Sequence, residues 1–141
     1  MYLKGDIPKA DGMRMKDESE TQTRKVLTAE IEALEVRYET LREYLAGRSR
    51  QIDDSEIALV LRAYKDNLST ISAHILTFYQ LKGQRAKITW ESLFTNIDTA
   101  LETIQNSAHP KPRAAIETAL NMSSPKIEEV MAYLATLKQS L

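Results

Sequence analysis

Apolar residues recur at alternating spacings of four and three along two neighbouring segments of the chain. Such a repeat, averaging about 3.5 residues, marks the contact face of helices that pack side by side. Only a short polar stretch separates the two stripes, so they predict a long helical hairpin or a coiled coil. The first stripe contains Leu27, Ile31, Leu34, Tyr38, Leu41 and Leu45, and the second contains Ile57, Leu61, Tyr64, Leu68, Ile71, Ile75 and Phe78.

Charged residues beside the first stripe bear on how it pairs. In a parallel homodimer, Glu30 would face Glu35, and Arg37 would face Arg42. An antiparallel mate can place each glutamate near an arginine instead. The charges therefore favour antiparallel pairing, although each exposed pair contributes only a few tenths to about 1 kcal/mol.

Two uses of the stripes remain open at this stage. The two helices can pack on each other and on the rest of the chain as a bundle, which we expect to be the main use. Alternatively, the hairpin projects and oligomerises. Leu59, Val60 and Leu76 lie off the second stripe and widen its apolar surface beyond one seam, which favours self-association.

Helix-ending residues set the limits of the hairpin. A first helix is expected over residues 23–46, ending at Gly47, because glycine takes the left-handed conformation that closes many helices. Asp53 and Glu56 have the spacing of a capping box, which places the start of the second helix. That helix is expected to continue to about Lys82, before Gly83.

Three shorter helices are expected after the hairpin. The first begins with Thr89 as its cap, and Ile88 packs on Leu93 as a hydrophobic staple. It ends at the prolines of residues 109–112, which cannot continue a helix. The next covers residues 112–120. The last begins with Pro125 at its first position, and one side of it carries Ile127, Val130, Met131, Leu134, Leu137 and Leu141.

The composition places the chain among soluble helical proteins. Its 141 residues are 43% hydrophobic and 28% charged, with four glycines, four prolines and no cysteine. We expect an all-α bundle consisting of a flexible N-terminal arm (1–21) and a single helical domain (22–141), divided into the hairpin (22–83) and the C-terminal helices (88–141). No apolar run approaches the ~20 residues that cross a membrane, and no secretion signal is evident, so a cytoplasmic location without membrane contact is predicted.

Residues suited to catalysis are few and isolated. His74, beside the second stripe, faintly resembles the reactive histidine of phosphotransfer domains, but Thr77 and Phe78 stand where those domains usually carry lysine and glycine. Asp98 and Glu102 share one helix face without any further catalytic or metal-binding group. The sequence therefore predicts no enzyme activity, no metal site and no cofactor.

The apolar pattern of residues 116–130 resembles that of a helix-turn-helix DNA-binding motif. Asn121, however, replaces the usual turn glycine, and the would-be recognition helix carries Glu128 and Glu129 against a single Lys126. Phosphate would repel those two carboxylates. Simple packing of the last two helices on each other is the expected arrangement.

An antiparallel hairpin would also gather cations at one end. The start of its first helix meets the end of its second, which would bring together Arg24, Lys25, Lys82, Arg85 and Lys87 as a candidate polyanion contact. The formal net charge is only −1, so any polyanion binding must be local.

Two functions are compatible with these features. We favour a non-catalytic adaptor or assembly factor that forms homo-oligomers and docks its helices on partner proteins. The alternative is a small nucleic-acid-binding accessory protein that oligomerises through the hairpin. In architecture, such a protein resembles a phage DNA-packaging recognition subunit. The alternative requires the cations at the end of the hairpin, whereas an adaptor does not.

Overall fold

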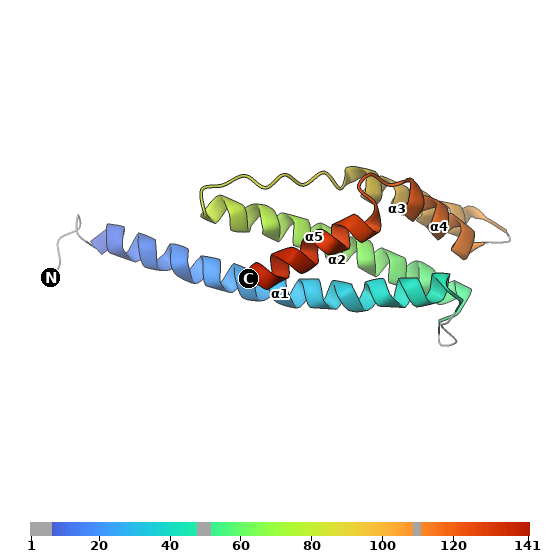
Figure 1. Cartoon of the computed structure of the whole chain (residues 1–141), viewed down its shortest axis with the longest axis horizontal. Helices are drawn as coiled ribbons and strands as arrows, with labels where there is room; N and C mark the ends of the chain where they lie inside the picture. The colour runs from blue at the N-terminus through green and yellow to red at the C-terminus, as the bar shows by residue number, and fades with distance from the viewer. Residues whose placement is uncertain (1–6, 48–51, 109–110) are drawn as a thin grey trace.

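The protein is an all-α bundle, as the sequence predicts (Figure 1). The computed structural model describes residues 7–47, 52–108 and 111–141, with side chains from residue 18 onward. Five α-helices and no strand occur in these ranges. The helices are α1 (Ile7–Leu45), α2 (Asp54–Leu81), α3 (Glu91–Asn106), α4 (Pro112–Met122) and α5 (Ile127–Ser140).

The first two helices form the predicted antiparallel hairpin. α1 ends at Leu45, and Gly47 follows with the expected left-handed backbone, at a φ of 71°. The Asp53 carboxylate caps α2 by accepting hydrogen bonds from the backbone N–H groups of Ser55 and Glu56, at 3.0 and 2.9 Å. Gly83, at a φ of 70°, follows the other end of α2, so the predicted limits of the second helix are confirmed.

The start of the first helix differs from the prediction. α1 begins at Ile7 instead of near Thr23, so it extends into the segment expected to be an arm. Glu20 pairs with Arg24 one turn later at 3.0 Å, and an ion pair at this spacing supports a helix without an apolar face. Figure 1 shows this part of α1 projecting past the end of α2.

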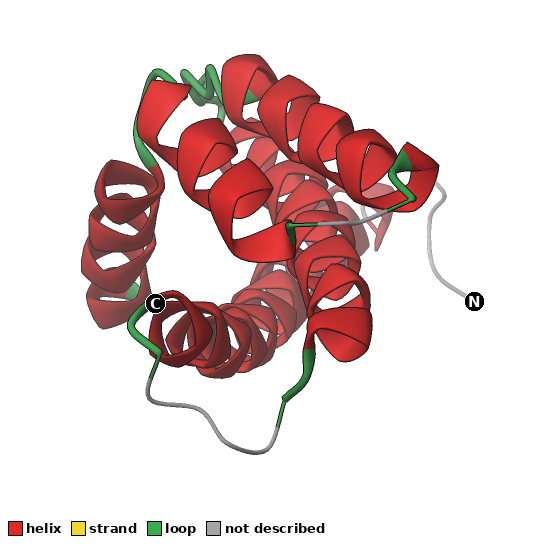
Figure 2. Ribbon diagram, turned by 90° about the vertical axis from the view of Figure 1, so that its right-hand side faces the viewer, coloured by secondary structure: helices red, strands yellow, loops and turns green. Residues whose placement is uncertain are grey.

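The C-terminal helices cover the hairpin in two different ways. α3 and α4 pack mainly on each other, while α5 packs along α1 (Figure 2). Two predicted starts are wrong. Trp90 takes the N-cap position of α3 instead of Thr89, and α5 begins at Ile127, after Pro125. Burial of Trp90, which is 5% exposed, fixes its position at the start of α3. α4 continues to Met122, beyond the predicted residue 120.

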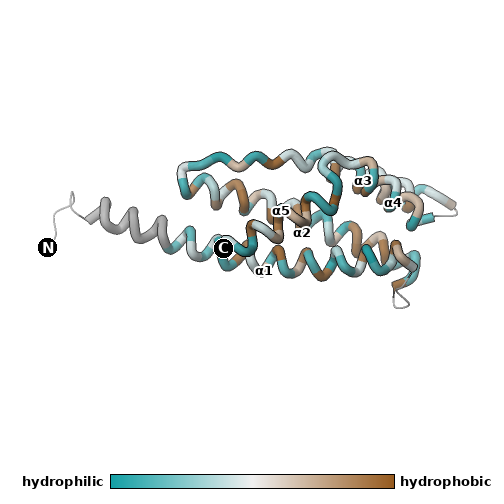
Figure 3. The backbone as a smooth tube through the Cα atoms, in the orientation of Figure 1, coloured by the Kyte–Doolittle hydropathy of each residue, from teal (hydrophilic) through white to brown (hydrophobic). Residues whose placement is uncertain are grey.

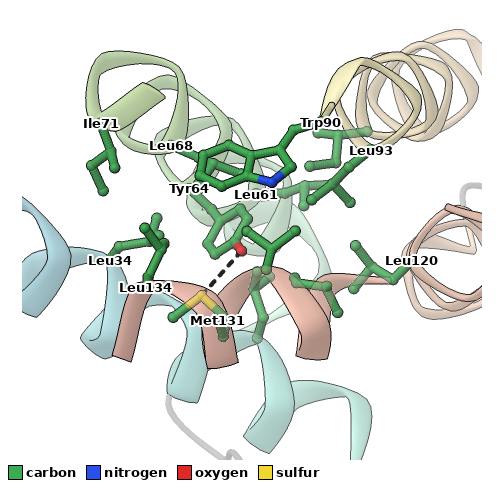
Figure 4. Close-up of a cluster of buried hydrophobic side chains, with 14 of the residues drawn as sticks. Leu34, Leu61, Tyr64, Leu68, Ile71, Trp90, Leu93, Leu120, Met131 and Leu134 are labelled. Carbon is green, nitrogen blue, oxygen red and sulfur yellow. Dashed lines mark hydrogen bonds between the residues drawn. The ribbon is translucent and has the colours of Figure 1, made fainter. Parts of the chain in front are cut away.

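A single hydrophobic cluster joins all five helices. Apolar and polar positions alternate along the turns of α1 and α2, as the hydropathy colouring shows (Figure 3). At the centre, the hydroxyl of Tyr64 on α2 donates to the sulfur of Met131 on α5 at 3.3 Å (Figure 4). Tyr64 is fully buried, and burial raises the pKa of its phenol. The thioether gives this core hydroxyl a partner that water cannot supply.

None of the described helices is both long enough and apolar enough to cross a membrane.

Candidate functional site

The heptad stripes lie inside the protein. Every predicted stripe residue of α2 is buried against the rest of the chain. On α1, Leu27, Ile31, Leu34 and Leu41 are buried, whereas Tyr38 and Leu45 are half-buried. Tyr44, outside the stripe, is only 3% exposed. An α-helix turns every 3.6 residues, so a 3.5-residue stripe drifts around it and neighbouring positions replace its last members.

Arg24 and Lys82 meet at the projecting end of the hairpin. Both cations lie over the ring of Phe78, with the Arg24 guanidinium carbon 5.0 Å and the Lys82 amino nitrogen 4.5 Å from its centre. The antiparallel pairing thus brings together two of the five cations predicted to form a cluster. A cation over an aromatic face is attracted by the negative charge on that face.

Arg24 is also held by contacts that complete the fold. Its guanidinium pairs with Glu20 at 3.0 Å and donates to the backbone carbonyl of Ser140 at 3.2 Å. That carbonyl lies at the C-terminal end of α5, where helix carbonyls lack partners and cations are stabilising. Arg24 therefore acts as a clasp between the first and last helices and is largely committed within the protein.

Arg85 and Lys87 lie on the segment that joins α2 to α3. We call this segment, residues 82–90, the strap. It runs back alongside α2 (Figure 1). Contacts with Phe78 thus join Arg24 and Lys82, and the five-cation cluster as a whole stays a prediction.

His74 has a partner that the sequence did not reveal. Its Nδ1 lies 2.8 Å from the Glu30 carboxylate on α1. The amide of Asn67 donates to the Glu30 backbone carbonyl at 3.3 Å, and the Arg37 guanidinium donates to the Asn67 side-chain oxygen. The sequence analysis treated His74 as isolated, and the contact with Glu30 shows that it is not. The contacts link the two helices of the hairpin.

Asp98 and Glu102 do not form a site with each other. Asp98 pairs with Lys65, which joins α3 to α2, and Glu102 is exposed. Across the described ranges, no three His, Asp or Glu side chains come close enough together to hold a metal ion.

Residues 116–130 do not pack as a helix-turn-helix motif. α4 packs mainly on α3, and α5 packs on α1, so the expected packing of the last two helices on each other is not their main contact. Buried Ser123 ties the turn between them to α3, because the amide of Asn96 donates to its hydroxyl at 3.2 Å.

A groove with a volume of about 590 Å³ lies between α3 and α4. Small side chains line most of it, and Lys111 is the one charged residue in the described part of its lining. Met122, which is 72% exposed, lies in its wall. We call this the α3–α4 groove; residues that characterise it are Thr99, Thr103, Ala114, Ala115, Thr118 and Met122.

The sequence analysis missed this groove, although small residues four apart in the sequence indicate it. Thr99 and Thr103, and likewise Ala114 and Thr118, are four residues apart, so each pair lies on one face of its helix. Hydrophobic periodicity depends on large apolar residues, so small residues at that spacing do not contribute to it.

Comparison of the chain with protein-family models, with curated proteins and with solved structures found no match.

Proposed function

We propose that the protein is a non-catalytic adaptor or assembly factor, and that the α3–α4 groove receives a helix of a partner protein. The groove is the observation that carries this proposal, because it is large, open and lined mainly by alanine and threonine. Small side chains let the backbone of an incoming helix approach closely, and docking of an amphipathic helix in an apolar groove is a common mode of protein recognition.

The lining of the groove also indicates what the partner helix carries. Met122 offers an adaptable apolar contact, since its unbranched side chain can take several conformations. Lys111 supplies a positive charge beside the first turn of α4. The partner helix should therefore have a narrow apolar face and a carboxylate positioned to meet Lys111.

The burial of the stripes changes the basis for self-association. We expected homo-oligomers because the hairpin seemed to expose more apolar surface than one seam needs. The stripe of α2 is buried within the chain, but Leu59 and Leu76, which lie off the stripe, are exposed. These leucines and the α3–α4 groove are surfaces on which a second copy could dock. A second copy of the chain is then one source of the docked helix.

Site-specific photo-crosslinking in cells tests the proposal with a matched pair of positions. Thr103 lines the groove, whereas the neighbouring Glu102 is exposed outside it. A photoreactive phenylalanine analogue at Thr103 should crosslink to one helical segment, mapped by mass spectrometry, and the same group at Glu102 should not. Equal crosslinking from both positions, or none from Thr103, would contradict the proposal.

Sedimentation velocity of the pure protein separates the two sources of that helix. A dimer at tens of micromolar that is lost in Thr103→Trp but kept in Glu102→Trp would identify a second copy as the occupant. A monomer mass for all three proteins would assign the crosslinked helix to a different protein.

The second candidate remains a small nucleic-acid-binding accessory protein. Lys25, Lys82, Arg85 and Lys87 have no ion-pair partner among the described residues, which favours some contact with an anion. Arg24, the fifth predicted cation, is already bonded to Glu20 and to the Ser140 carbonyl, which weakens the case for a long polyanion. A DNA shift assay titrated with salt tests it, because each phosphate contact lowers affinity by roughly one log unit per log unit of salt.

A further inference from the structure

The strap is an extended segment with one basic face. Its side chains alternate, with Arg85, Lys87 and Thr89 exposed, while Ala86 and Ile88 are partly buried. Trp90 is buried at the end of the segment. In an extended chain, successive side chains point to opposite sides, so Arg85 and Lys87 share the outer side at a spacing of about 6.6 to 6.8 Å.

The backbone of the strap is open as well. In the described part of the protein, no hydrogen bond is donated by the N–H groups of residues 85–89. At its start, by contrast, the Gln84 N–H donates to the Tyr79 carbonyl at 2.8 Å and anchors the strap to α2. The anchored beginning and the buried Trp90 hold a row of available backbone donors between them.

A hollow with Leu76 in its wall adjoins the start of the strap. It has a volume of about 530 Å³ and lies between α2 and the strap, where Leu76, Gln80, Gln84 and Arg85 form part of its wall. Leu76 is 51% exposed although it is a leucine. The sequence analysis counted Leu76 among the residues that widen the apolar surface of the second stripe.

We propose that the strap binds an extended acidic segment of a partner protein. Carboxylates at alternate residues of that segment meet Arg85 and Lys87, because alternate side chains of two extended chains have the same spacing. The guanidinium of Arg85 can hold a carboxylate through two parallel hydrogen bonds. One apolar side chain of the segment lies against Leu76, and its backbone carbonyls accept from the open N–H groups.

Several observations favour a peptide over a nucleic acid at this surface. Leu76 suits an aliphatic side chain, whereas the bases of a single-stranded nucleic acid stack on aromatic side chains, and the described lining of the hollow contains none. Arg24, which would extend the basic surface around the end of the hairpin, is already paired with Glu20. The strap also lies apart from the α3–α4 groove in its lining residues, so this proposal does not depend on the proposed function.

Fluorescence anisotropy with a defined probe tests the proposal. The probe is a labelled synthetic peptide with one leucine followed by three glutamates that alternate with threonines. Arg85→Gln/Lys87→Gln should bind it about tenfold more weakly than the unchanged protein at low salt, as expected for the loss of two partly exposed ion pairs. The control, Arg62→Gln/Lys126→Gln, removes two exposed cations elsewhere and should bind within about twofold of the unchanged protein.

Two further probes distinguish register and class of ligand. A peptide of the same composition with its three glutamates adjacent should bind more weakly, and amide NMR shifts on binding of the alternating peptide should concentrate at residues 85–89. Equal loss in the control variant, equal binding of both peptides, or no binding of the alternating peptide would overturn the proposal. Tighter binding of a ten-residue oligothymidylate than of the peptide would overturn it in favour of a nucleic acid.

Discussion

The α1–α2 and α3–α4 pairs are both antiparallel helical hairpins, yet the seam of the first is filled and that of the second leaves a groove. In α1–α2 the seam is filled by large side chains such as Leu34, Leu68 and Ile71, all fully buried. In α3–α4 large residues such as Leu93 and Ile116 face the core, while alanine and threonine face outward and leave the groove. The size of the side chains in the seam thus decides whether two packed helices are closed or can receive a third.

The comparison also assigns the two seams different roles. Burial of large apolar side chains contributes roughly 1.5 to 3 kcal/mol each, so the α1–α2 seam supplies much of the stability. Little of the groove lining is large and apolar, so substitutions there change stability only slightly. A seam used for stability is unavailable to a partner, and the groove remains for recognition.

The largest expected effect comes from placing the same charge in each seam. Ile71→Asp buries a carboxylate without a partner and should lower the free energy of unfolding by about 3 to 5 kcal/mol. Thr103→Asp places it in the exposed groove and should change stability by less than about 0.5 kcal/mol. Thermal unfolding followed by circular dichroism measures both, and similar losses in the two variants would break the distinction between the seams.

The next effect concerns the third helix that closes the α1–α2 seam. Met131→Ala leaves a cavity and deprives the Tyr64 hydroxyl of its acceptor, so we expect a loss of about 2 to 5 kcal/mol. Tyr64→Phe alone should cost little, because the ring remains packed. In a double-mutant cycle, Tyr64→Phe should recover part of the loss in Met131→Ala. Strict additivity would show that the hydroxyl–sulfur contact contributes nothing.

A smaller, pH-dependent effect is expected at Tyr44, which lies near the C-terminal end of α1. Burial, followed by the 2.6 Å hydrogen bond that it donates to Asp54, raises the pKa of Tyr44 to about 12. A raised pKa means that the fold favours the neutral phenol. Its contribution is complete below the ordinary pKa near 10 and is lost as the pH rises toward 12.

Tyr44→Phe cannot ionise and should therefore lose less stability between pH 9 and 11.5 than the unchanged protein. Urea midpoints at the two pH values provide the measurement. Identical losses in the two proteins would show that Tyr44 does not titrate differently in the folded state.

The smallest effect is expected outside both seams. His74→Ala removes the contact with Glu30, but the side chain of His74 is 38% exposed, so the loss should stay below about 1 kcal/mol. Fold and activity should remain intact. Stable transfer of radiolabelled phosphate onto the unchanged protein from a phosphorylated response regulator, absent in the variant, would instead support a phosphotransfer role.

The sequence was most informative where large apolar residues repeat. It predicted the whole buried stripe of α2 and the cap at Asp53, because periodicity and capping act over a few residues. It could not place Arg85 and Lys87, since nine residues without periodicity let the strap run in any direction from the end of α2. It also missed Glu30 as the partner of His74, a contact between residues far apart in the chain.

The start of α1 and the α3–α4 groove were missed for a related reason. Polar helix formers near Glu20 and small residues such as Ala114 leave no apolar stripe. Hydrophobic periodicity does not detect a helix without an apolar face. It also does not detect a groove that is lined by small side chains.

The clasp between Arg24 and the end of α5 has a consequence for synthesis on the ribosome. α1 and α2 can pair as soon as the strap emerges, but the face of α1 that α5 covers stays open until the last helix is made. At about 5 to 20 residues per second, translation of residues 91–141 takes roughly 3 to 10 s. During that interval the nascent hairpin exposes leucines and isoleucines, so chaperones that recognise apolar segments should bind it until α5 is released.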